Sequence, residues 1–85
     1  MGARSLHGLA APRPLHVITA PDGAPHAVEV QGTRRVVVAI REEWLVQDRW
    51  WTSEPVDRHY YELLLEPGRV MTLYREERGG DWYHH

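Results

Sequence analysis

Apolar and polar side chains alternate along much of the chain with the two-residue period that is typical of β-strands. Strand-like runs cover residues 15–20 and 26–30, on either side of the segment PDGAP at residues 21–25. In that segment proline fixes φ, aspartate accepts a turn conformation and glycine accepts a left-handed one. We therefore predict a bulged hairpin centred on this segment.

Residues 34–40 are rich in β-branched side chains and are apolar on both faces, as a central strand would be. We expect this to be the most buried strand. Residues 41–46 either continue the strand or form a short helix, because Ile40, Trp44 and Leu45 also fit one face of a helix. We favour an extended, bent strand.

A second hairpin is predicted from residues 58–66 and 70–76, which flank Pro67-Gly68. This dipeptide prefers a type II turn, whose twist fits a two-residue hairpin poorly, so we expect a longer loop. Gly79-Gly80 then separates the hairpin from a last short segment, Trp82-Tyr83.

Both faces of the strand predicted at residues 58–66 carry apolar side chains. Alternation places His59 with Tyr61, Leu63 and Leu65 on one face, and Tyr60 with Glu62 and Leu64 on the other. Such a strand needs cover on both sides, which a barrel wall or a dimer would supply. We predict an all-β fold: a small antiparallel barrel or strongly bent sheet of five to seven short strands.

The ends of the chain suggest one domain with a leader. Residues 1–13 lack strand alternation and contain Gly2, Gly8 and Pro12, so we expect a flexible N-terminal leader, followed by a single β domain over residues 14–85. Eighty-five residues bury only a thin core, and dimerisation could add to it.

Composition narrows the cellular setting. The chain has no cysteine and no signal-peptide pattern, and its longest apolar run, residues 36–40, is far too short to cross a membrane. We predict a cytoplasmic protein. All ten basic residues are arginine, which is consistent with GC-rich coding.

Charge is unevenly distributed. Residues 1–41 hold five arginines against two acids, a net charge of +3, whereas residues 42–85 hold five arginines against ten acids, a net charge of −5. Phosphate binding requires a basic face. The acidic balance of the second half therefore counts against a nucleic-acid interface there.

All eight aromatic residues lie between residues 44 and 83, interleaved with arginine. Tryptophan, tyrosine and arginine are enriched in binding hot spots, although in so small a domain large aromatics more often form the core. The candidate partner-binding residues are Trp50, Trp51, Arg58, Tyr60, Tyr61, Arg75, Trp82 and Tyr83. If residues 50–51 are in a strand, Trp50 and Trp51 point to opposite faces. Arg49, Arg58, Arg69 and Arg75 could stack on rings, but pairing with nearby acids is the commoner outcome.

Five short motifs occur in a fixed order along this half: Asp48-Arg49-Trp50-Trp51, Arg58-His59-Tyr60-Tyr61-Glu62, Gly68-Arg69, Leu73-Tyr74-Arg75 and Trp82-Tyr83. As an ordered set they resemble the C-terminal tail of ImuB-type proteins, which are catalytically inactive relatives of Y-family polymerases, and of small stand-alone bacterial proteins with the same tail. The resemblance covers about half of the chain, residues 44–83.

The resemblance implies a link to translesion synthesis and DNA damage tolerance, in which an ImuB-like adaptor brings an error-prone polymerase to damaged DNA. In that setting the tail looks like a protein-interaction module. The chain departs from the adaptor in lacking polymerase-like domains, and without phenylalanine it has no Gln-x-x-Leu-Phe clamp-binding peptide.

No catalytic or metal-binding pattern stands out. The acids form no recognisable motif, Ser5 and Ser53 have no histidine at diagnostic spacing, and there is no lysine for a phosphate loop. His84-His85 could offer metal ligands with Asp81 and Glu77, but we expect a frayed terminus instead. We therefore predict a non-enzymatic domain with no cofactor and no metal.

These observations favour a protein-interaction module, with translesion polymerase accessory proteins as the candidate partners. The alternative is a single-stranded nucleic-acid-binding small β-barrel, in which bases stack on the aromatics while Arg34, Arg35 and Arg41 follow the backbone. A third possibility is an interface that serves only self-association, as in a homodimer.

Overall fold

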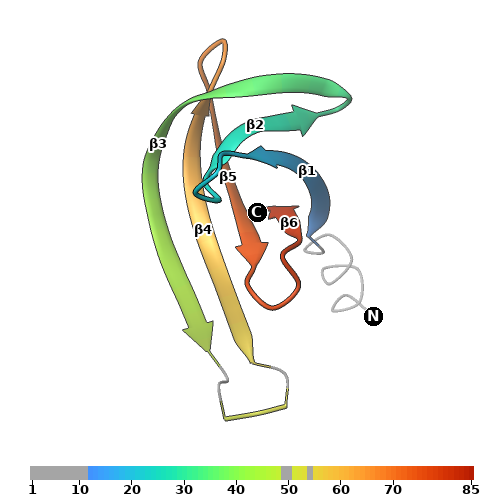
Figure 1. The fold of residues 1–85 in the computed structure, drawn as a ribbon, viewed down its shortest axis with the longest axis vertical. Coiled ribbons are helices and arrows are strands. Elements are labelled where there is room, and N and C mark those ends of the chain that lie inside the picture. The colour runs from blue at the N-terminus through green and yellow to red at the C-terminus, as the bar shows by residue number, and fades with distance from the viewer. Residues whose placement is uncertain (1–11, 49–50, 54) are drawn as a thin grey trace, which may run out of the picture.

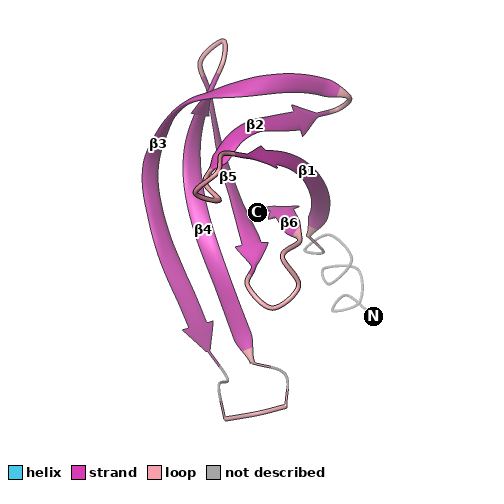
Figure 2. Cartoon of the chain, viewed as in Figure 1, coloured by secondary structure: helices cyan, strands magenta, loops and turns pink. Residues whose placement is uncertain are grey.

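The protein is a closed antiparallel β-barrel. The computed structural model describes residues 12–48, 51–53 and 55–85, and the described residues form strands and loops without a helix (Figure 2). The strands are β1 (Arg13–Thr19), β2 (Pro25–Val30), β3 (Thr33–Asp48), β4 (Val56–Leu65), β5 (Arg69–Glu76) and β6 (Trp82–His84). Each strand pairs with the next in sequence, and β6 pairs back with β1 to close the barrel (Figure 1). The predicted fold class is confirmed.

The N-terminal boundary differs slightly from the prediction. Most of the predicted leader lies outside the described residues. Its last residue, Arg13, is already the first residue of β1, where it pairs with His84 of β6.

The two predicted hairpins are both present. In the β1–β2 turn the Ala20 N–H donates to the Ala24 carbonyl at 2.8 Å, the Asp22 carboxylate accepts from the Ala24 N–H at 3.0 Å, and Gly23 has a φ of 90°. In the β4–β5 hairpin Leu65 pairs with Arg69, which leaves a loop longer than two residues. The expectation of a longer loop at Pro67-Gly68 is therefore confirmed.

Strand β3 turns a corner between two partners. Its first residues pair with β2 as far as Val36, and the rest of the strand pairs with β4 alone (Figure 1). Two irregularities, between Val37 and Ala39 and between Ile40 and Glu42, each place one extra residue on β3. Such bulges bend a strand and increase its twist. The bent-strand interpretation of residues 41–46 is confirmed, and the helical one is wrong.

The expectation that residues 34–40 form the most buried strand is wrong. No side chain of β3 falls in the buried class, and Val38 is 58 % exposed. The apolar pattern on both faces suggested cover on both sides, but beyond Val36 this strand has one neighbouring strand among the residues that the structure describes. By contrast β4, which lies between β3 and β5, has buried residues on both faces.

The core fills the inside of the barrel. Tyr61, Leu63 and Leu65 lie on one face of β4, as predicted, and this face points inward, where they pack with residues of the other strands. The buried members of this core are Val28, Tyr61, Leu63, Leu65, Met71, Leu73 and Trp82. No polar or charged residue in the described part of the chain is buried. The described residues include no helix that could cross a membrane.

Candidate functional site

Four aromatic side chains form a continuous row on the outside of the barrel. Trp44 of β3 pairs with Tyr60 of β4, Tyr60 pairs with Tyr74 of β5, and Tyr74 pairs with Tyr83 of β6. The ring centroids of successive members lie 5.3, 4.9 and 5.4 Å apart. Directly opposed aromatic pairs of this kind stabilise antiparallel sheets. We call this row the aromatic ladder.

The ladder is covered at its centre and open at its β3 end. Tyr60 and Tyr74 are only 8 % and 3 % exposed, whereas Trp44 is 40 % exposed. The guanidinium of Arg58 lies 4.6 Å from the centroid of the Tyr74 ring and donates to the Glu76 carboxylate at 2.7 Å. Burial raises the pKa of the Tyr74 hydroxyl. Trp44 is therefore the ladder member most available to a partner.

Arg58 is fixed in place by several partners. Burial lowers its pKa, but hydrogen bonds to the Tyr60 hydroxyl and the Glu76 carboxylate outweigh that effect, so the pKa lies above its ordinary value. An arginine held in this way ties the ladder together and keeps its charge.

Next to Trp44 runs an unpaired strand edge. Within the described part of the chain, β3 residues 37–48 hydrogen-bond to β4 on one side and have no strand on the other. An edge of this kind presents backbone N–H and C=O groups to a further strand. Apolar side chains are exposed along it: Val38, Ile40, Trp44 and Leu45. We call residues 37–48 with these side chains the open edge.

Two charged residues of the open edge, Arg41 and Glu43, pair with β4. Arg41 lies 3.8 Å from Glu62, and the Glu43 carboxylate is 2.7 Å from the His59 ring. Near the far end of the edge, Gln47, Val56, Asp57 and Arg78 line a small depression of about 200 Å³.

Inside the barrel, a second aromatic group closes the end that carries the β1–β2 turn. The Tyr61 ring stacks on His59 at 4.3 Å and contacts Trp82 at 5.5 Å. Arg75 lies 5.5 Å from the Trp82 ring and bonds to Glu77 at 2.8 Å. Burial raises the pKa of the Tyr61 hydroxyl, and the charge of Arg75 only partly offsets this.

The structure separates the predicted partner-binding residues into several settings. Trp50 lies outside the described residues, and Trp51 is in the turn after β3 with 67 % of its surface exposed. Tyr60 and Tyr83 belong to the aromatic ladder, whereas Tyr61 and Trp82 are buried in the core. The predicted pairing of arginines with acids is confirmed for Arg58 and Arg75; Arg49 lies outside the described residues.

Sequence reasoning did not assign Val38, Ile40, Trp44 and Leu45 to a site. The signal that could have found them is the run Arg41-Glu42-Glu43 inside an otherwise apolar strand. Charged residues in a strand are typical of sheet edges.

The remaining candidates are dispersed. Arg34 and Arg35 are adjacent on β3 and therefore point to opposite faces, and Arg41 is engaged with Glu62. The expectation of a frayed terminus at His84-His85 is wrong, because His84 belongs to β6 and the His85 N–H donates to the Thr72 carbonyl at 3.0 Å. Among the described residues no group of histidines and acids could hold a metal ion.

Comparisons of the chain with protein-family models, with curated proteins and with solved structures found no match.

Proposed function

We propose that the chain is a non-enzymatic, cytoplasmic protein-interaction module that binds an extended segment of a partner protein at the open edge of β3. The added strand would pair with the backbone groups of residues 37–47 that point away from β4. Strand addition of this kind obtains affinity from main-chain hydrogen bonds and specificity from alternate side chains.

The observation that carries this proposal is the combination of a free edge with exposed apolar side chains on the same strand. Each backbone hydrogen bond contributes about 0.5–1.5 kcal/mol net. Trp44 and Leu45 point to opposite faces of β3, so a partner strand could place side chains against both. Trp51, which follows the edge, offers a further exposed aromatic surface.

We further propose that the partner belongs to the machinery of translesion synthesis, as an accessory in DNA damage tolerance. The support is the ordered set of motifs at residues 44–83, which resembles the tail of ImuB-type adaptors. Two of these motifs contribute the β4 and β5 members of the aromatic ladder, Tyr60 and Tyr74.

The test is direct binding of the full chain to purified translesion proteins, an ImuB-type adaptor and its error-prone polymerase, by biolayer interferometry at physiological salt. Val38→Lys and Leu45→Lys place charge on the open edge, and we expect each to weaken binding at least about tenfold, or about 1.4 kcal/mol. The matched control is Val70→Lys, because Val70 is a similarly exposed apolar residue on β5. Equal affinity for wild type and both edge variants would contradict the use of this edge.

Two controls separate this proposal from the other functions. If the chain binds single-stranded nucleic acid, an oligonucleotide will quench tryptophan fluorescence at low salt, and the affinity will fall steeply as salt increases. If the open edge serves only self-association, sedimentation velocity will show a dimer that Leu45→Lys dissociates. We expect no saturable quenching and a monomer.

A further inference from the structure

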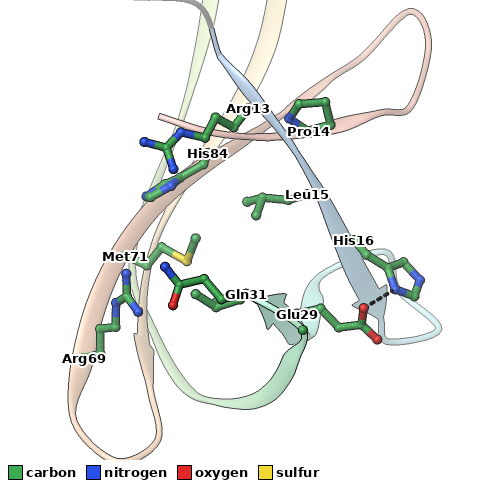
Figure 3. Close-up of a pocket in the computed structure, with 11 residues that line it drawn as sticks. Arg13, Pro14, Leu15, His16, Glu29, Gln31, Arg69, Met71 and His84 are labelled. Carbon is green, nitrogen blue, oxygen red and sulfur yellow. Dashed lines mark ion pairs between the residues drawn. The ribbon is translucent and has the colours of Figure 1, made fainter. Parts of the chain in front are cut away.

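A pocket of about 320 Å³ opens at one end of the barrel. The pocket lies at the end of the barrel where β1 and β5 begin and where β2 and β6 end. Its lining includes Arg13, Leu15, Val30, Arg69, Met71 and His84 (Figure 3). This end is opposite the one closed by Tyr61, Trp82 and Arg75, because β1 and β5 begin here and β2 and β6 end here. The volume is at the lower limit for sites that hold small organic molecules.

The alternation of side chains along β1, β5 and β6 directs three cationic side chains into this pocket. Arg13 and His84 are a directly opposed pair, two residues beyond the pair of Leu15 and Trp82 that faces the core. The same alternation places Arg69 on the inner face, opposite the core residue Leu65. Figure 3 shows these groups together along one side of the pocket.

No acid in the described part of the chain compensates these cations. Arg13 and Arg69 make no hydrogen bond or ion pair with the described residues, in contrast to Arg58 and Arg75, which each hold a glutamate. The pocket includes one carboxylate, Glu29, which lies 3.3 Å from the His16 ring and is paired with it (Figure 3).

The positive charges of Arg13 and Arg69 affect the pKa of His84. Burial lowers the pKa of His84, and the charges of Arg13 and Arg69 lower it further, as does His85. A bound anion would offset the repulsion between the two arginines and a protonated His84.

Three apolar side chains also line the pocket: Leu15, Val30 and Met71. Leu15 and Val30 pack against the core, and Met71 is buried within it. Met71 is a flexible side chain that adapts to ligands of different shape. The pocket therefore offers cationic and apolar groups together, and Figure 3 shows Met71 between His84 and Arg69.

We propose that this pocket binds a small organic anion, in which a phosphate or carboxylate group is held by Arg13, Arg69 and His84 and an apolar body lies against Leu15, Val30 and Met71. A phosphate group suits the three cations best, because it carries more charge and more acceptor oxygens than a carboxylate. The site is separate from the open edge of β3 and does not depend on the function proposed for that edge.

The test is an NMR titration of the ¹⁵N-labelled full chain with phenylphosphonate, benzoate and benzyl alcohol, which share an aromatic ring and differ in charge. We expect saturable shifts at Arg13, Arg69 and His84, with affinity decreasing from the phosphonate to benzoate and no saturation with the alcohol. Inorganic phosphate in a fourth titration measures what the anionic group contributes without the ring.

Matched variants locate the site. We expect Arg69→Gln to weaken phenylphosphonate binding at least about tenfold, as for the loss of one charged hydrogen-bonding group. Arg34→Gln removes an exposed arginine of β3 that does not line the pocket, and should leave the affinity unchanged. The absence of saturable shifts at 10 mM phenylphosphonate, about ten times a millimolar Kd, would overturn the proposal, as would equal effects of the two variants.

A pH series tests the part played by His84. Benzenesulfonate keeps one negative charge at every pH used, so any change in its affinity reports on the protein. We expect tighter binding as pH falls and His84 becomes protonated, and we expect His84→Gln to remove most of this dependence. The titratable groups nearby are His85 on the same strand and the His16–Glu29 pair on β1 and β2. An unchanged pH profile in His84→Gln would show that His84 does not contact the anion.

Discussion

Strands β3 and β4 pair along ten positions and have similar apolar content, but they differ in burial. In β4 the side chains of Tyr60 and Tyr61, on opposite faces, are both buried. In β3 the directly paired residues, Trp44 and Glu43, are exposed. The strands differ in the number of their neighbours, because β4 has β3 and β5, whereas the second part of β3 has β4 alone.

This difference shows that the number of neighbouring strands decides whether the apolar side chains of a strand contribute to stability or remain available for binding. Apolar side chains in a strand with neighbours on both edges contribute to stability through packing. The same side chains beside a free edge remain in contact with water and are available to a partner. We therefore expect substitutions in β4 to change folding and substitutions in the second part of β3 to change binding.

The largest contrast should come from one substitution made on both strands. Leu63 of β4 is fully buried, and we expect Leu63→Ala to lower the free energy of unfolding by about 3–5 kcal/mol because it leaves a cavity. Leu45 of β3 is mostly exposed, so Leu45→Ala should change the free energy of unfolding by no more than about 0.5 kcal/mol. Urea denaturation measures both, and similar losses would show that β3 is covered in solution.

The aromatic ladder allows a finer comparison across the strands. We expect Tyr74→Leu to lower the free energy of unfolding by about 1–3 kcal/mol, because it removes ring contacts with both Tyr60 and Tyr83. Trp44→Leu removes one ring contact and should have about half that effect. Thermal denaturation checks the order, and Tyr74→Phe is the control that keeps the rings. A larger loss for Trp44→Leu would contradict the burial difference along the ladder.

Alkaline pH tests whether both faces of the β4–β5 pair are buried. Tyr61 faces inward and Tyr74 outward, and burial raises the pKa of both. The folded protein therefore keeps protons that the unfolded chain loses near pH 10, so stability should fall as pH rises above about 10. Urea midpoints between pH 8 and 11 measure this decline. Tyr61→Phe should make it shallower, whereas Trp44→Leu, which has no titratable group, should leave it unchanged.

The smallest expected effect on stability comes from the end of the barrel that carries the pocket. Because the pKa of His84 is lowered in the folded protein, the unfolded chain binds the proton more readily, and stability should fall as pH decreases through about 6.5. The relevant quantity is the difference in this pH dependence between wild type and His84→Gln. We expect the variant to lose less stability between pH 7.5 and 5.5, and an identical profile would contradict the lowered pKa of His84, which is due to its burial first and to the nearby cations second.

The sequence predicted the strands better than their surroundings. Alternation and turn residues located both hairpins and assigned the faces of β4 correctly, because these features depend on neighbours in sequence. The burial of residues 34–40 was predicted wrongly, because it depends on how far β2 extends beside β3. The pocket was missed for a similar reason: Arg13, Arg69 and His84 come together only when β6 pairs with β1.

The two bulges of β3 have a consequence for how the chain tolerates changes in length. Val38 and Arg41 are the extra residues, since neither has a direct partner on β4. Removing either one leaves the flanking residues of β3 paired as before and on the same faces, because inside and outside alternate regularly once the extra residue is gone. What is lost is the local bend and twist that the bulge adds to the strand. We therefore expect deletion of Val38 or of Arg41 to keep the register of β3 against β4 and to change only the bend of the strand.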